Sequence, residues 1–181
     1  MPNTITWWKL TVTETSTSTS KKMDSQEIAH TLQKLPSFGG VYSKDNIDKK
    51  KMKKAVKTKQ PFGIVINTAN HGLPGKHWIA LHIDSQNKTA DYFDSLGGKP
   101  QHYEGLLALK ESLGARGTLN YNCTPIQPDT SDTCGNYCVL FLLEKNQGTD
   151  FKHFIEQYFT PDKHVNDKLV KKYLDVLKKH I

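Results

Sequence analysis

The chain has 181 residues, of which 36% are hydrophobic, and its 25 lysines and arginines outnumber its 18 acidic residues. This length fits one domain with a substantial core, and no apolar run approaches the roughly 18 residues of a membrane-spanning helix. The N-terminus also lacks a basic region followed by an apolar run. These features argue against an integral membrane protein, and we expect a soluble, monomeric protein that is not secreted.

The N-terminal segment over residues 1–23 differs in composition from the rest of the chain. It joins a β-prone run, ITWWKLTVTET, to the low-complexity stretch STSTSKK, which has too few apolar groups to offset the entropy of ordering. We predict a flexible arm here and one domain over residues 24–181. Trp7 and Trp8 could dock the arm onto the domain as an added edge strand, with a disordered tail as the alternative.

The domain begins with a predicted helix. Asp24 and Glu27 have the spacing of a capping box, and apolar residues follow at helical spacing until Pro36. The two glycines that follow, Gly39 and Gly40, predict a loop that continues into VYSKDNI at 41–47.

A lysine-rich segment comes next, with eight lysines over residues 44–59 opposed by two aspartates. Such a patch can neutralise phosphates, and the candidate nucleic-acid contacts are Lys49, Lys50, Lys51, Lys53 and Lys54. The chain has a single arginine, so bidentate recognition of base edges is not expected. A solvated loop or helix explains the segment equally well, and the pattern leaves its secondary structure open.

Three strand-like runs lie in the middle of the chain. FGIVIN at 62–67 is apolar throughout, which predicts a central strand covered on both faces. HWIALHID at 77–84 and TADYFD at 89–94 are joined by the polar connection SQNK and predict an antiparallel hairpin.

The C-terminal half is mainly helical in pattern. Helices are predicted over 104–113, 134–145, 150–159 and 165–180, with a short strand at 118–122. The fold class that follows is α+β, with a mixed β-sheet packed against helices.

Cys134 is the candidate nucleophile. A thiol reacts as the thiolate, which a helix N-terminus or a neighbouring imidazole favours. Cys134 lies between the polar loop IQPDTSDT and the helix-like run CGNYCVLFLLEK, and Gly135 beside it leaves room for a substrate backbone. Local sequence alone supports a buried structural thiol equally well, and Cys138 has the surroundings of a core residue.

The three cysteines form an odd set without the paired spacing of a disulfide framework. We therefore expect reduced thiols, and hence an intracellular or intravirion setting. A zinc site built from Cys134, Cys138 and a histidine is a weaker interpretation, because no second ligand pair lies at short spacing, and we expect no metal.

His77 and Asp94 are the candidate base and its orienting acid. His77 opens one strand of the predicted hairpin and Asp94 ends the other, so the hairpin brings the two side by side. Asp84 flanks the turn at the far end, and Asp91 has the opposite strand parity. An aspartate that accepts from one imidazole nitrogen leaves the other to take the thiol proton, although Asp94 could also be a turn residue.

Gln127 is the candidate oxyanion donor. It precedes Cys134 by seven residues in a loop with Pro125 and Pro128, whose fixed φ angles would hold its amide in place. Its side-chain N–H and the backbone N–H of Cys134 could bind the developing oxyanion. Its position relative to Cys134 is the only support for this role.

Four segments resemble the adenovirus maturation protease (adenain) group of cysteine peptidases, which is related more distantly to the SUMO-specific, Ulp-type proteases. They are SFGGVYSKDNI at 37–47, GIVINTANHGLPGKHWIALHID at 63–84, DYFDSLG at 91–97 and QPDTSDTCGNYCVLFL at 127–142. The segments keep the family order of His, acidic residue, Gln and Cys, and the resemblance covers residues 24–160.

The resemblance implies a papain-like, adenain-like fold with the nucleophile at a helix N-terminus. It assigns the roles of nucleophile, base, orienting acid and oxyanion donor to Cys134, His77, Asp94 and Gln127. Trp78 would line the substrate groove, although a core aromatic is an equal interpretation. Viral members cleave capsid and core precursors after motifs ending in glycine, which implies a maturation protease acting in the virion and infected cell.

The resemblance has two departures. Asp94 stands where adenoviral enzymes carry Glu, as it does in the SUMO-specific branch. No cysteine clearly matches the one through which the adenoviral enzyme binds its activating peptide, so we expect residues 3–14 to add a strand in cis.

No cofactor is expected for the chemistry itself, but the resemblance implies DNA or a peptide as an activator. Two alternatives remain open: a ubiquitin-like-protein (SUMO-type) protease, and a basic nucleic-acid-associated binding protein with an inactive protease-like fold.

Overall fold

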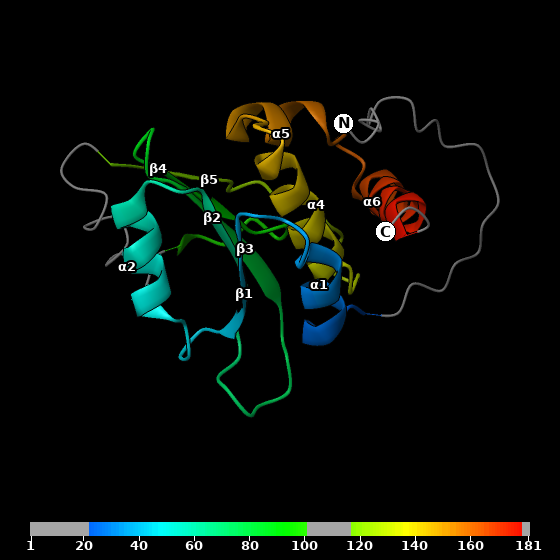
Figure 1. Cartoon of the computed structure of the whole chain (residues 1–181). Helices are drawn as coiled ribbons and strands as arrows, with labels where there is room; N and C mark the ends of the chain where they lie inside the picture. Colours follow the sequence, from blue (N-terminus) through cyan, green and yellow to red (C-terminus); the bar gives the residue numbers. More distant parts are fainter. Residues whose placement is uncertain (1–21, 101–116, 179–181) are drawn as a thin grey trace.

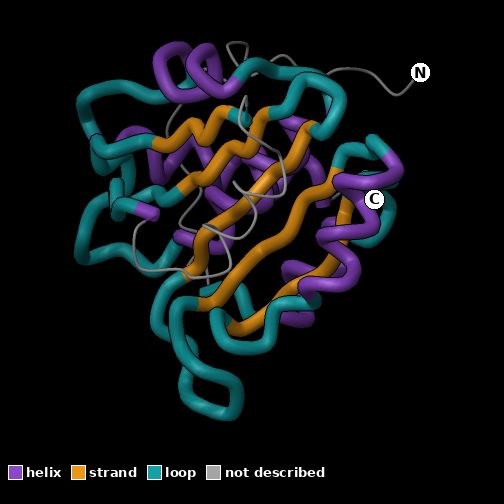
Figure 2. The backbone as a smooth tube through the Cα atoms, turned by 90° about the vertical axis from the view of Figure 1, so that its left-hand side faces the viewer, coloured by secondary structure: helices purple, strands orange, loops and turns teal. Residues whose placement is uncertain are grey.

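The centre of the structure, a computed structural model that describes residues 22–100 and 117–178, is a mixed sheet of five strands within those residues. The strands are β1 (Phe38–Ser43), β2 (Phe62–Asn67), β3 (Trp78–Asp84), β4 (Thr89–Phe93) and β5 (Thr118–Tyr121), and they lie side by side in chain order (Figure 2). β2, β3 and β4 are antiparallel, whereas the outer pairs β1–β2 and β4–β5 are parallel. The predicted α+β class with a mixed sheet is confirmed.

The predicted hairpin is β3 and β4, which pair from Asp84 opposite Thr89 to Ala80 opposite Phe93. β2 is buried at all six positions, as its apolar run predicts, and lies between β1 and β3. The middle strand of the sheet is β3 rather than β2.

The prediction of a loop after Pro36 is wrong, because β1 occupies residues 38–43. The glycines that suggested a loop instead mark an irregularity in the register between Phe38 and Gly40. Gly40 has a φ of +130°, and a side chain on Gly39 would collide with the ring of Phe62. Glycine here allows a kinked strand to approach its neighbour closely.

Helices cover both faces of the sheet, with α1 (Ser25–Leu32), α4 (Cys134–Asn146), α5 (Phe151–Gln157) and α6 (Lys163–Lys178) on one side and α2 (Lys49–Thr58) on the other (Figure 1). Asp24 and Glu27 form the predicted capping box of α1. The lysine-rich segment is helical, and Asp48 caps it by accepting from two backbone N–H groups. The predicted helix at 104–113 and the arm up to residue 21 lie outside the described residues.

The two faces of the sheet carry separate apolar cores. On β3, Trp78 and Ala80 face the α4 side, whereas Ile79, Leu81 and Ile83 face the α2 side. α4 is buried around most of its circumference, between the sheet and the other helices, which explains its apolar sequence without a polar stripe. Packing on all sides fixes the position of its first residue, Cys134. In the part of the chain that the structure describes, no helix has the length and apolar character of a membrane span.

Candidate active site

Cys134 is the first residue of α4, and its side chain is buried with 4% exposure. The preceding residue, Thr133, donates its hydroxyl to Asp167 at 2.8 Å, and its side chain accepts no hydrogen bond from the first backbone N–H groups of α4. The first backbone N–H groups of α4 therefore remain directed at the space around Cys134, and the positive end of the helix favours negative charge there.

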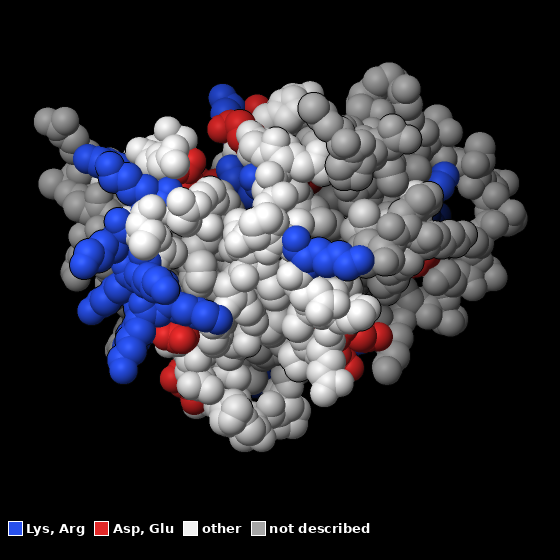
Figure 3. All heavy atoms as spheres, viewed as in Figure 1, with Lys and Arg blue, Asp and Glu red and all other residues white. Residues whose placement is uncertain are grey.

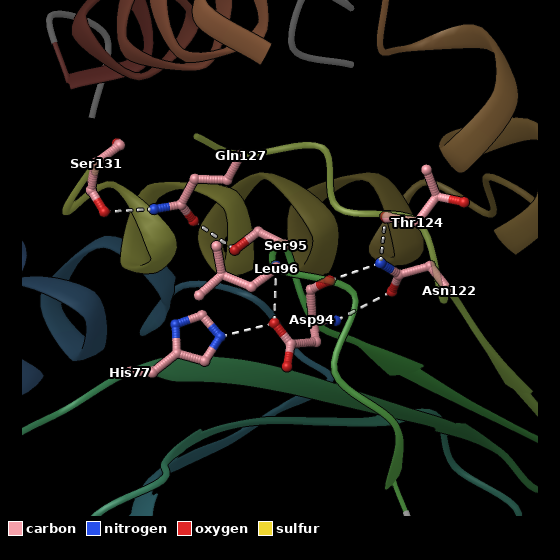
Figure 4. A network of polar contacts seen from close by, with 8 residues as sticks. All are labelled: His77, Asp94, Ser95, Leu96, Asn122, Thr124, Gln127 and Ser131. Atoms are coloured by element: carbon pink, nitrogen blue, oxygen red, sulfur yellow. Dashed lines mark hydrogen bonds and ion pairs between the residues drawn. The ribbon is translucent and has the colours of Figure 1, made fainter. Parts of the chain in front are cut away.

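His77 lies just before β3 and is bound by Asp94, with 2.7 Å between His77 Nε2 and Asp94 Oδ1. Figure 4 shows the second ring nitrogen turned away from that carboxylate. Burial lowers the pKa of His77, but hydrogen bonds to Asp94 and Cys134 and the charges of both groups raise it, to about 9 overall. His77 is therefore held between the carboxylate and the thiol and favours the imidazolium form at neutral pH.

Asp94 is itself fixed by the loop that follows β4. Its Oδ1 also accepts from the backbone N–H of Leu96 at 2.8 Å. Asn122, at the end of β5, accepts from the Asp94 backbone N–H at 3.1 Å and donates to the Asp94 carbonyl at 2.6 Å. A side chain on Gly98 would collide with Asp94 Oδ2. The sequence pattern missed Asn122; its only signal is a polar residue at the end of the predicted strand at 118–122.

Gln127 is buried, with 1% exposure, and both ends of its amide are held (Figure 4). Its Oε1 accepts from the hydroxyl of Ser95 at 2.6 Å, and its Nε2 donates to the backbone carbonyl of Ser131 at 2.9 Å. The Ser95 carbonyl also accepts from the backbone N–H groups of Ile126 and Gln127. Because an amide nitrogen carries two hydrogens, one N–H of Gln127 remains for a further acceptor.

The loop before His77 is closed by Asn67, the last residue of β2. The Oδ1 of Asn67 accepts from the backbone N–H groups of Ala69 at 2.9 Å and Lys76 at 3.3 Å. Thr68 donates its N–H to the His77 carbonyl at 2.9 Å. The Asn-Thr-Ala sequence before the His-Trp pair therefore ties the two ends of the loop together and fixes the backbone of His77.

Trp78 and Gly135 occupy the junction of α1, β3 and α4. Trp78 is buried and its Nε1 donates to the Met23 carbonyl at 3.1 Å, as a core aromatic would. It also lines a cavity of about 490 Å³ between the start of α1, the ends of β1 and β2 and residues 70–75. The space beside Gly135 is filled by Met23, Ile28 and Trp78, so its missing side chain permits close packing. Substrate contact by either residue stays a prediction.

Asp84 and Asp91, the alternatives to Asp94, have other partners. Asp84 accepts from backbone N–H groups in the β3–β4 turn, and Asp91 forms an ion pair with Lys145 at 2.8 Å. Cys138 is fully buried, and burial raises the pKa of its thiol well above the ordinary value. The candidate nucleic-acid lysines lie on α2, across the sheet from α4. Within residues 22–100 and 117–178, no group of three or more His, Cys, Asp and Glu side chains is placed to hold a metal.

The sequence is similar to those of viral cysteine proteases. Residues 11–178 match the model of the Ulp1 protease family, C-terminal catalytic domain. A cysteine protease of African swine fever virus is 23% identical over 171 residues, which cover 88% of this chain and 60% of that protein. A protease of bovine adenovirus B serotype 3 is 28% identical over 137 residues, or 68% of this chain and 63% of that protein. The chain thus spans less than two thirds of the length of either relative.

The fold is similar to that of the SUMO protease Ulp1. The two chains are 16% identical, and their superposition covers 84% of this chain and 76% of that chain with a TM-score of 0.53. These matches confirm the predicted adenain-like fold and the resemblance to the adenovirus protease group, with the SUMO-specific proteases as more distant relatives.

Proposed function

Because the chain belongs to the Ulp1 protease family, we propose that it is a cysteine endopeptidase with Cys134 as its nucleophile. The observation that carries this proposal is the position of His77, which is hydrogen-bonded to Asp94 at 2.7 Å and whose pKa is raised by both Asp94 and Cys134. The arrangement supplies the three groups that activate a thiol: a base, an acid that orients the base, and a helix N-terminus.

In the proposed reaction, the proton of the Cys134 thiol has passed to His77, which is an imidazolium, and the thiolate attacks the carbonyl carbon of a peptide bond. The carbonyl oxygen becomes an oxyanion, which the backbone N–H of Cys134 and the second N–H of Gln127 stabilise. The C–N bond then breaks while His77 gives its proton to the leaving amine, and a thioester remains on Cys134. Water attacks this thioester, His77 takes the water proton and returns it to sulfur, and the carboxylic acid leaves.

The proposed substrates are capsid and core precursor proteins cut at glycine-containing sites, in the virion and the infected cell. The viral relatives support the setting. The burial of Cys134 supports glycine, because a thiol with 4% exposure leaves room for a slim segment of backbone. In peptide substrates, replacing the glycine before the cut with alanine should lower kcat/KM by at least about tenfold, since a methyl group must then enter a packed site. Equal rates would contradict the glycine preference.

The second candidate is a protease for ubiquitin-like proteins, which the family and the similarity to SUMO protease Ulp1 favour. Such an enzyme would recognise the folded body of its partner as well as the tail. The two candidate functions can be distinguished by measuring kcat/KM for a folded protein with a diglycine tail and for the corresponding short tail peptide. A kcat/KM at least about 100-fold higher for the folded protein supports this candidate, since that ratio requires binding energy from beyond the tail. Equal values support the endopeptidase.

The test of the mechanism is covalent labelling of Cys134. A glycine-ended peptide carrying a thiol-reactive group should label Cys134 at neutral pH, and His77→Ala should slow that labelling at least about 100-fold because the thiol loses its base. His153→Ala, an exposed histidine on α5, is the matched control and should label like the wild type. Labelling confined to the exposed Cys123, or indifferent to His77, would defeat the mechanism.

We also propose that the α2 face binds DNA without sequence preference. The exposed lysines that make up this face gather over α2 in Figure 3 and include Lys49, Lys50, Lys51, Lys53 and Lys54. Each phosphate contact contributes about −0.9 to the slope of log affinity against log salt for duplex DNA. Replacing Lys53 and Lys54 with alanine should make the slope shallower by about two, whereas Lys168→Ala on α6 should not change it. A salt-insensitive affinity would contradict this proposal.

A further inference from the structure

Asp167, on α6, is a buried carboxylate that holds three hydroxyl groups outside its own helix. It is 8% exposed. Its Oδ2 accepts from Ser131 Oγ at 2.5 Å, and its Oδ1 accepts from Thr133 Oγ1 at 2.8 Å and from the Tyr137 hydroxyl at 3.0 Å. Burial, and the charge and hydrogen bond of Asp167, raise the pKa of Tyr137. The carboxylate therefore receives enough hydrogen bonds to remain buried.

Asn166, the neighbouring residue on α6, holds the other end of the same loop. It is fully buried, and its Nδ2 donates to the Ile126 carbonyl at 3.0 Å and to the Thr160 carbonyl at 2.9 Å. Its Oδ1 accepts from the Thr160 backbone N–H at 2.8 Å. Two consecutive side chains of one helix thus fix the loop over residues 126–133 at its start and at its end.

This loop carries the groups that would bind the oxyanion. Gln127 follows Ile126, and the carbonyl that accepts from Gln127 Nε2 belongs to Ser131, whose hydroxyl is bound to Asp167. Thr133, also bound to Asp167, immediately precedes Cys134 and its backbone N–H. The two proposed oxyanion donors are therefore both connected to Asp167, each through one intervening residue.

We infer that Asn166 and Asp167 are positioning residues for the oxyanion hole, an inference that rests on the proposed peptidase function. Neither side chain has a hydrogen bond to His77 or Cys134 among the contacts within residues 22–100 and 117–178. They therefore position the two oxyanion donors and do not act on the thiol or its base. Preorganised donors lower the barrier because they need not reorient as charge develops.

The test is Asp167→Asn, which keeps the shape of the side chain but removes the charge and one acceptor. Asp175→Asn, an exposed position on the same helix, is the matched control. With a peptide substrate, kcat should fall about 10- to 100-fold while KM stays within about a factor of two, since misplaced donors weaken the transition state more than substrate binding. The inhibition constant of a peptide aldehyde, which forms a tetrahedral adduct, should rise by the same factor.

Alkylation of Cys134 by iodoacetamide supplies the contrast, because that displacement forms no oxyanion. Its rate and pH profile in Asp167→Asn should match the wild type within about threefold. A general disturbance of the fold would instead slow turnover and alkylation together, and that result would overturn the inference. So would a kcat equal to that of the wild type.

Amide hydrogen exchange separates this inference from the proposed function. Residues 126–134 should exchange at least about tenfold faster in Asp167→Asn than in Asp175→Asn, because the loop loses its anchor. A wild type without peptidase activity would defeat the proposed function, whereas unchanged exchange would defeat the positioning role whatever the activity. If Asp167→Asn does not fold, Ser131→Ala removes one hydroxyl alone and should show the same pattern with a smaller fall in kcat.

Discussion

Replacement of Asp94 by asparagine removes the charge beside His77 while it keeps the size of the side chain. In the wild type, burial lowers the pKa of His77 and the combined effects of Asp94 and Cys134 raise it from 6.5 to about 9. That difference corresponds to about 3 kcal/mol in favour of the imidazolium form. Asp94 contributes both a hydrogen bond and a charge to it, so we expect the pKa in Asp94→Asn to fall to roughly 6.5 or below.

The expected consequence is a shift of the alkaline limb of the pH–rate profile. If the active form pairs a thiolate with the His77 imidazolium, kcat/KM of the wild type should decline as the pH rises through about 9. In Asp94→Asn the decline should come near pH ~6.5. At pH ~8 the imidazolium fraction would then fall about 30-fold, and loss of ring orientation should add to this.

The assay is kcat/KM for a glycine-containing peptide, measured across the stable pH range for the wild type, Asp94→Asn and Asp129→Asn. Asp129 is exposed in the loop after Gln127, so its replacement controls for the loss of one negative charge. The alkaline limb of the pH–rate profile of Asp129→Asn should match that of the wild type. NMR titration of His77 would measure the same pKa directly. An alkaline limb that stays near pH ~9 in Asp94→Asn would refute the assignment of Asp94 as the group that holds the imidazolium.

Three other variants test separate parts of the proposal. Gln127→Ala should lower kcat about 100- to 1,000-fold and leave iodoacetamide alkylation of Cys134 unchanged, and a loss of less than about threefold would remove Gln127 from the oxyanion hole. Gly98→Ala should lower kcat/KM at least about tenfold, because the new methyl group meets the Asp94 carboxylate and must displace it. Deletion of residues 1–20 should reduce peptide turnover if that arm activates the domain in cis, and unchanged turnover would contradict that role.

Sequence patterns predicted the elements that are periodic and local. The hairpin of β3 and β4 followed from two strand-like runs joined by a polar connection, and the start of α4 followed from the change from a polar loop to a helix-like run. These elements place His77, Asp94 and Cys134. β1 was missed because its glycines, typical of loops, here serve a kinked edge strand. The secondary structure of the lysine-rich segment that forms α2 could not be predicted. Only two of its residues, Met52 and Ala55, are buried, and two apolar positions among so many lysines are a weak signal for a helix.

The supporting side chains of the site could not be predicted in the same way. Asn122 lies 28 residues from Asp94, and Asp167 lies 36 residues from Ser131, so each contact depends on how whole elements pack. A polar residue that is buried by such packing looks identical in sequence to a solvated one. Only the three-dimensional arrangement shows which of them is satisfied by a partner.

The sheet topology has a consequence for the order in which the site is assembled during folding. β2, β3 and β4 are joined by short connections in an antiparallel meander, whereas β1 and β5 join through longer crossovers. Contacts close in sequence form first because their loop-closure cost is small. We therefore expect high φ-values in β3 and β4 and low ones in β5. His77 and Asp94 would then pair early in folding. A chain whose α4 has not yet docked would have the oriented base but no nucleophile beside it, so it could not cleave other protein chains while it is still folding.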